Sequence, residues 1–184
     1  MKYYLTLIFG LLSLFGANAQ FSQKEAFDLA GGYIENGYSG KFGYNRSIGQ
    51  KGSIRLNGQV NFEVFENMQF DDIKLNVYLV NAEYYYRIFD INSSDILISI
   101  GAGGAAGYED LLNDSKLDNG QELAEKSNVI YGGHIGVEID KYLFQVSPSG
   151  NSISLFAQAR QYYFTQTDFG ANQFNAMLGF RFNF

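Results

Sequence analysis

The end of the chain, residues 173–184, reads QFNAMLGFRFNF. Starting at Phe174, every second residue is apolar, and the residues between them are mostly polar or small. Successive side chains of a β-strand point to opposite faces, so this segment would present one apolar and one largely polar surface. In an α-helix the same apolar residues would be scattered around the axis. The segment is therefore predicted to be a strand that ends on an aromatic residue, Phe184.

The same alternation continues through the rest of the chain. From Ile54 to Val64, every even-numbered residue is apolar or glycine and every odd-numbered residue is polar or charged. This criterion predicts eight strands, at 26–35, 38–48, 53–68, 71–89, 95–109, 127–140, 152–164 and 173–184. Turn-forming residues such as Asn36-Gly37 and the run 49–52 separate them. Since no segment has a convincing helical period, the fold class is predicted to be all-β.

Two all-β architectures could use such strands. A soluble sandwich buries its apolar faces, whereas a small membrane barrel turns them toward lipid and fills its lumen with polar side chains. The polar faces carry both signs of charge, on Asp28, Lys41, Arg55, Glu63, Glu83, Arg87, Glu138, Arg160 and Arg181. Tyrosines gather near the strand ends, with Tyr33, Tyr38, Tyr108, Tyr131 and Tyr163 toward one rim and Tyr44, Tyr84, Tyr86 and Tyr142 toward the other. Aromatic girdles of this kind favour a single eight-stranded antiparallel up-and-down transmembrane β-barrel, whose narrow lumen is predicted to be polar and plugged.

The composition agrees with one such domain. The chain has 184 residues, of which 17% are aromatic. It has no cysteine, which excludes disulfides and thiolate metal sites. Its 13 basic and 19 acidic residues give a formal charge of −6, which argues against direct nucleic-acid binding.

The N-terminal segment is predicted to direct export. Residues 1–19 have a lysine near the start, an apolar run and an Ala-x-Ala end, the pattern of a signal peptide cleaved between Ala19 and Gln20. Residues 20–184 would then form an outer-membrane barrel domain. With both termini periplasmic, the connections at 36–37, 69–71, 110–126 and 165–172 are expected outside the cell. The longest connection of the chain, 110–126, is then an extracellular loop.

Three features invite a catalytic or binding interpretation. Residues 101–106, GAGGAA, match the dinucleotide pattern G-x-G-x-x-A, but no amphipathic helix follows to receive a pyrophosphate, so the glycines are expected to relieve crowding or shape curvature in a strand. His134 is the single histidine, and only Ser154 and Asp28 suggest themselves as partners for a catalytic base. A hydrogen-bonded histidine inside the lumen is the preferred interpretation.

The third feature is an acidic segment, 109–126. It holds Glu109, Asp110, Asp114, Asp118, Glu122 and Glu125 against Lys116 and Lys126. Its spacing does not match a helix–loop–helix calcium site, so a solvated acidic loop is preferred. Contact of this loop with a partner protein or a surface polysaccharide is left open. The sequence therefore predicts no catalytic, cofactor-binding or metal-binding residue, and no enzyme activity.

Several segments resemble the conjugative-transposon TraO family of Bacteroidetes. They are Asn128–Gly133, the closing Gly179–Phe184, the glycine-rich run from Gly101 that ends in Gly107-Tyr108-Glu109, and the aromatic stretch Glu83–Tyr86. The resemblance implies an outer-membrane component of a conjugative-element transfer apparatus, with outer-membrane lipid and other proteins of the apparatus as partners. The alternatives are an adhesion or porin-like barrel unrelated to conjugation, and a lipid-modifying barrel enzyme that would need a histidine, a serine and an acid at one rim.

Overall fold

The computed structural model describes residues 25–67, 70–91, 96–111, 127–146, 151–165, 167 and 171–184. The predicted signal peptide and its cleavage site lie outside these residues. Eight strands follow one another along the chain: β1 (Glu25–Ile34), β2 (Gly37–Ile48), β3 (Gly52–Asn67), β4 (Phe70–Ile91), β5 (Ile96–Leu111), β6 (Ser127–Gln145), β7 (Ser152–Thr165) and β8 (Asn172–Asn183).

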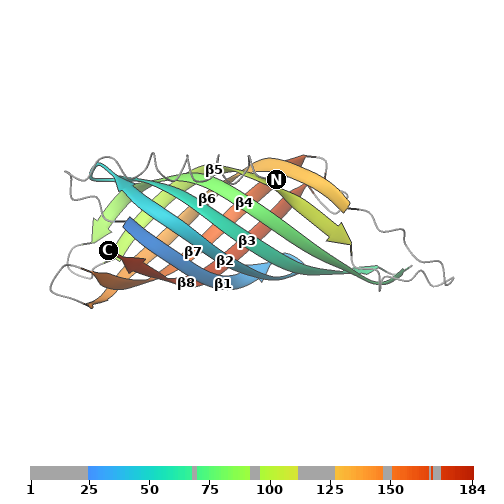
Figure 1. Cartoon of the computed structure of the whole chain (residues 1–184), viewed down its shortest axis with the longest axis horizontal. Coiled ribbons are helices and arrows are strands. Elements are labelled where there is room, and N and C mark those ends of the chain that lie inside the picture. Colours follow the sequence, from blue (N-terminus) through green and yellow to red (C-terminus); the bar gives the residue numbers. More distant parts are fainter. Residues whose placement is uncertain are drawn as a thin grey trace, which may run out of the picture.

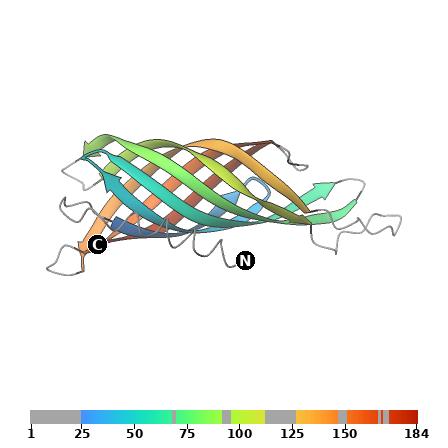
Figure 2. The same ribbon diagram turned by 45° about the horizontal axis from the view of Figure 1, so that its top comes forward.

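The strands close into one barrel (Figure 1, Figure 2). Each strand pairs antiparallel with the next, and β1 also pairs with β8, with Phe27 opposite Phe182. The up-and-down barrel predicted from the alternation is therefore confirmed. Among the described residues, no helix is long and apolar enough to cross a membrane.

The observed strands begin and end within two residues of the predicted bounds, with one exception. β6 continues to Gln145, five residues past the predicted end at 140. A register shift between Tyr142 and Phe144 lets the strand keep pairing with β7 beyond Lys141. A bulge of this kind breaks the alternation locally, so the sequence pattern ends before the strand does.

The two ends of the barrel differ. One end, here the terminal rim, holds Glu25, the C-terminal Phe184 and the tight turn at 49–51, where Gly49 has a φ of 62°. The opposite end, here the distal rim, holds the turn at 35–36. At the distal rim β3 and β4 project furthest, because β2 pairs with β3 only as far as Glu63 and β5 pairs with β4 only from Leu75. Figure 1 shows this extension at the right of the barrel.

The barrel is apolar outside and largely polar inside. Large apolar side chains are exposed on every strand, for example Leu29 at 57%, Val80 at 58% and Leu178 at 57%. Asp28, by contrast, is buried between the exposed Phe27 and Leu29. This inverts the arrangement of a soluble protein and is the arrangement that a lipid-facing barrel requires.

The tyrosines predicted for the two rims lie on the outer face, with one correction. Tyr142 shares the inward phase of Glu138 and Asp140 on β6 and lines the mouth of the lumen at the terminal rim. The prediction of an apolar face for Tyr142 is wrong, because the alternation of β6 continues unbroken from the outward-facing Ile139 to this residue.

Candidate functional site in the barrel interior

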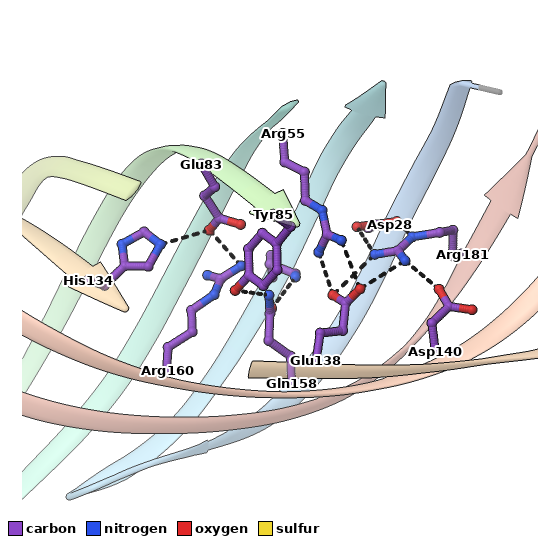
Figure 3. A network of polar contacts seen from close by, with 11 residues as sticks. Asp28, Arg55, Glu83, Tyr85, His134, Glu138, Asp140, Gln158, Arg160 and Arg181 are labelled. Carbon is purple, nitrogen blue, oxygen red and sulfur yellow. Dashed lines mark hydrogen bonds and ion pairs between the residues drawn. The ribbon is translucent and has the colours of Figure 1, made fainter. Parts of the chain in front are cut away.

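The terminal half of the lumen holds a cluster of ion pairs (Figure 3). The Arg181 guanidinium donates to Asp28 Oδ1 at 2.7 Å and to Glu138 Oε1 at 3.0 Å, and it also pairs with Asp140. Arg55 donates to both carboxylate oxygens of Glu138, at 2.8 Å to Oε1. These five side chains come from β1, β3, β6 and β8, so they join opposite walls of the barrel.

A second cluster lies at mid-height. Glu83 Oε1 is 2.7 Å from a guanidinium nitrogen of Arg160 and 3.3 Å from His134 Nε2. The His134 ring also packs on Tyr162, with 4.8 Å between the ring centroids. Arg160 donates to the Tyr162 hydroxyl at 2.9 Å, so the guanidinium lies between a carboxylate and a phenol.

Tyr85 and Gln158 lie between the two clusters (Figure 3). Gln158 donates to the Tyr85 hydroxyl at 2.7 Å and accepts from Lys41 Nζ at 2.7 Å. The Arg55 guanidinium lies over the Tyr85 ring, 4.0 Å from its centroid. The two clusters and the side chains between them, here called the network, reach from the terminal rim to the middle of the barrel.

The network is electrically balanced. It contains four basic side chains, Lys41, Arg55, Arg160 and Arg181, and four acidic ones, Asp28, Glu83, Glu138 and Asp140, all at most 7% exposed. Charges buried away from water are tolerated only when they are paired and hydrogen-bonded. The arrangement therefore suits a role in holding the barrel closed.

The distal half of the lumen is less polar than the terminal half, because a cluster of apolar side chains points into it. The cluster consists of Leu75, Val77, Leu79, Ala105, Leu111, Ile130, Tyr162 and Phe164, each at most 8% exposed. The sequence predicts a polar lumen throughout. The prediction holds for the terminal half, whereas β4 to β7 carry inward-facing apolar residues near the distal rim.

A polar cavity of about 370 Å³ opens at the terminal rim. The Arg55, Glu138 and Arg181 side chains line its inner end, and serines from β2, β3, β5 and β7 line its walls. The cavity therefore shares three side chains with the ion-pair network.

His134, Ser154 and Asp28, the residues considered for a catalytic site, bind different partners. His134 contacts Glu83 and Tyr162, whereas Asp28 binds Arg181 and Ser154 accepts a hydrogen bond from Asn183 at 3.2 Å. The described residues also hold no group of three or more His, Cys, Asp or Glu side chains that could bind a metal ion. Most of the acidic segment 109–126 lies outside the described residues, and its first residue, Glu109, is buried and accepts from Thr167 at 2.6 Å.

Two charged residues predicted for the interior network lie apart from it. Arg87 sits at the terminal rim, 3.5 Å from Asp90 with both side chains partly exposed, and Glu63 sits near the distal rim beside Gln173. Asp140, Tyr85 and Gln158 are not among the interior residues predicted from the sequence. Each lies two residues from a charged residue on the same face of its strand: Asp140 from Glu138, Tyr85 from Glu83 and Gln158 from Arg160. This spacing could have placed them inside the barrel.

The glycines of the 101–106 run make room for the network, as expected from their place in a strand. A Cβ at Gly101 would lie 2.6 Å from the Tyr85 ring, and one at Gly103 would lie 2.5 Å from the Ala82 carbonyl oxygen and 2.8 Å from the His134 ring. These distances are too short for any side chain. The run therefore allows Tyr85 and His134 to pack against β5.

We expect Gly101→Ala to destabilise the barrel by about 1–3 kcal/mol, because the added methyl group displaces the Tyr85 ring. Gly104→Ala on the same strand is the matched control, since its Cβ would point outward and meet only the Gly132 carbonyl oxygen at 3.9 Å. Urea unfolding of the detergent-solubilised proteins measures both. Equal stability of the two variants would contradict the assigned role of Gly101.

The fold is the one found in small eight-stranded outer-membrane β-barrels. A major outer membrane protein from Thermus thermophilus matches with a TM-score of 0.67 and 12% identity, covering 89% of this chain and 100% of that one. The N-terminal β-barrel domain of Pseudomonas aeruginosa OprF matches at 0.60 and 14% identity, covering 88% and 97%. Neisserial surface protein A (NspA) matches at 0.57 and 16% identity, also covering 88% and 97%. At these identities the similarity establishes the fold.

The family is established by sequence. The model of the conjugative transposon protein TraO family matches residues 23–184, and the chain belongs to that family. No curated protein matches the chain at a significant level. The family membership confirms the resemblance drawn from the glycine-rich run and the closing strand.

Proposed function

We propose that this protein is a structural component of the transfer apparatus of a conjugative element, located in the outer membrane of the donor cell. Membership of the TraO family is the observation that carries the proposal. The apolar outer face supports the location, because exposed side chains such as Leu29 and Val80 suit contact with lipid. Outer-membrane lipid and other proteins of the apparatus are its expected partners, and DNA is not.

The interior supports a structural role over an enzymatic one. Acid–base catalysis needs a base placed within hydrogen-bond reach of the proton it takes from a substrate. His134 is instead enclosed at mid-height, with its side chain fully buried against Glu83 and Tyr162. The lipid-modifying barrel considered above would need its histidine at a rim.

The orientation follows from the location. Small outer-membrane barrels have short turns at the periplasmic side and longer loops outside. The terminal rim, with its tight turn at 49–51, is therefore assigned to the periplasm, and the distal rim, with the longest connection at 112–126, to the cell exterior.

Single-cysteine labelling tests this orientation without background, because the chain has no cysteine. Asn36→Cys at the distal rim is expected to react with an impermeant maleimide on intact cells. Gln50→Cys at the terminal rim, where the side chain is also exposed, is expected to react only after the outer membrane is opened. The opposite pattern would reverse the assignment.

The interior also supports a barrel closed to ions. We expect planar-bilayer recordings of the purified protein to show no steady conductance, because the buried side chains of the ion-pair network and of the distal apolar cluster point into a lumen of only eight strands. Heat-denatured protein serves as the control for leaks caused by detergent. A stable open channel would support the porin-like alternative instead.

Conjugal transfer from donors that lack the gene tests the proposed function itself. Transfer is expected to be lost from such donors and restored by a plasmid copy. Recipients that lack the gene are expected to receive DNA normally, since the apparatus is assembled in the donor.

A further inference from the structure

An apolar groove of about 650 Å³ crosses the outer wall of the barrel from β4 to β8. Two parallel rows of outward-facing side chains form its banks. One row runs from Tyr84 through Ile135 to Phe174, and the other runs from Tyr86 to Val137. The backbone of residues between the rows, including Gly101 and Gly136, forms the floor.

The groove runs obliquely between the two ends of the barrel. Its first end, at Tyr84 and Tyr86, lies five to seven residues inside the terminal-rim end of β4 at Ile91. Its other end, at Phe174, lies two residues inside the start of β8 near the distal rim. Four strand spacings separate the ends, or about 19 Å. For strands tilted by about 45° this corresponds to a height of about 13 Å, close to one leaflet of a hydrocarbon core about 30 Å thick.

The first of these two rows contains one polar side chain, Gln161. Gln161 faces outward on β7, between Ala159 and the exposed Tyr163, and opposite Phe174. Among the described outward-facing residues between the two sets of rim tyrosines, it is the only one with a polar side chain other than tyrosine. Its amide makes one long contact, from Nε2 to the Tyr162 carbonyl oxygen at 3.5 Å. An amide in an apolar surface is costly unless it finds a hydrogen-bond partner.

The occupant of the groove must match both features. The groove continues the apolar wall that meets lipid, and it has the width of two strand residues, or about 7 Å, between its banks. An acyl chain fits this length and polarity. Gln161 can both donate and accept, so it suits a chain whose linkage near the head group does the same. Amide-linked 3-hydroxyacyl chains have that chemistry, whereas the ester linkages of phospholipids only accept.

We propose that the groove binds one acyl chain of lipid A from the outer leaflet, with the amide of Gln161 hydrogen-bonded to the linkage of that chain. The proposal rests on the outer-membrane location and orientation proposed above. It is independent of any part in DNA transfer.

Native mass spectrometry of the purified barrel in detergent, with lipid A or dipalmitoylphosphatidylethanolamine added, tests the proposal. Wild type is expected to retain one lipid A and little phospholipid. Ala102→Phe with Ala159→Phe fills the groove and is expected to reduce lipid A retention at least tenfold. Ala82→Phe with Ala106→Phe is the matched control, since both alanines face outward on the same wall but outside the groove.

Gln161→Leu distinguishes the contribution of the amide hydrogen bond to lipid A binding from that of the apolar groove. It is expected to weaken lipid A retention by about two- to tenfold, the effect of one hydrogen bond. Equal retention by the groove-filled variant and its control would overturn the proposal. Equal retention of phospholipid would overturn the choice of lipid A, and a dimer that disappears on filling the groove would replace the lipid with a second copy of the chain. Because the assay uses no transfer reaction, its failure is distinguishable from failure of the proposed function.

Discussion

Arg181→Met is expected to lower the free energy of unfolding by about 3–5 kcal/mol, because it leaves buried carboxylates without their partner. Arg181 binds Asp28, Glu138 and Asp140, and in the variant Arg55 still pairs with Glu138, whereas Asp28 and Asp140 lose the guanidinium that they bind. Urea titration of the barrel in detergent micelles, followed by the change in gel mobility between folded and unfolded forms, measures the loss.

Two further variants show whether charge is the cause. Arg87→Met makes the same substitution in a pair at the terminal rim, where the side chains of Arg87 and Asp90 are 34% and 45% exposed, and is expected to cost at most about 1 kcal/mol. Arg181→Met combined with Asp28→Asn is expected to be more stable than Arg181→Met alone, because the second change removes a buried charge that has lost its partner. A double variant no more stable than the single one would show that Arg181 acts by packing alone.

The sequence predicts the strands and their faces well, because a period of two residues determines which side chains share a face. The bounds of β1 and β8 are correct to one residue, and Asp28 and Arg181 are both placed on the inward face. The sequence could not predict that these two residues bind each other. They are 153 positions apart, and their contact depends on closure between β1 and β8.

The apolar distal half of the lumen could not be predicted for a related reason. Near the distal rim, β4 has apolar residues on both faces, with Leu75, Val77 and Leu79 inside and Tyr78 and Val80 outside. An unbroken apolar run has no alternation, so it gives no information on which residues meet across the lumen. The packing of Tyr162 and Phe164 from β7 against these leucines forms only in the closed barrel.

The second large effect is expected on conjugation. A donor that lacks the gene is expected to transfer its element at a frequency below detection, because the barrel is proposed to be a part of the apparatus rather than an accessory enzyme. Phe184→Asp places a charge on the outer face at the terminal rim, next to Phe27, whose ring centroid is 5.3 Å from that of Phe184. It is expected to reduce the amount of assembled barrel and the frequency of transfer together.

The most direct test of a structural role in transfer is a measurement of transfer frequency. The donor lacks the chromosomal gene and carries a plasmid copy with His134→Gln. Surface labelling of Asn36→Cys confirms that the amount of barrel matches wild type. Glutamine places an uncharged polar side chain beside Glu83 but cannot act as a general base. Transfer at the wild-type frequency is expected from these donors, and none is expected from donors with an empty plasmid. Normal transfer from the empty-plasmid donors, or loss of transfer with His134→Gln at matched barrel levels, would contradict it.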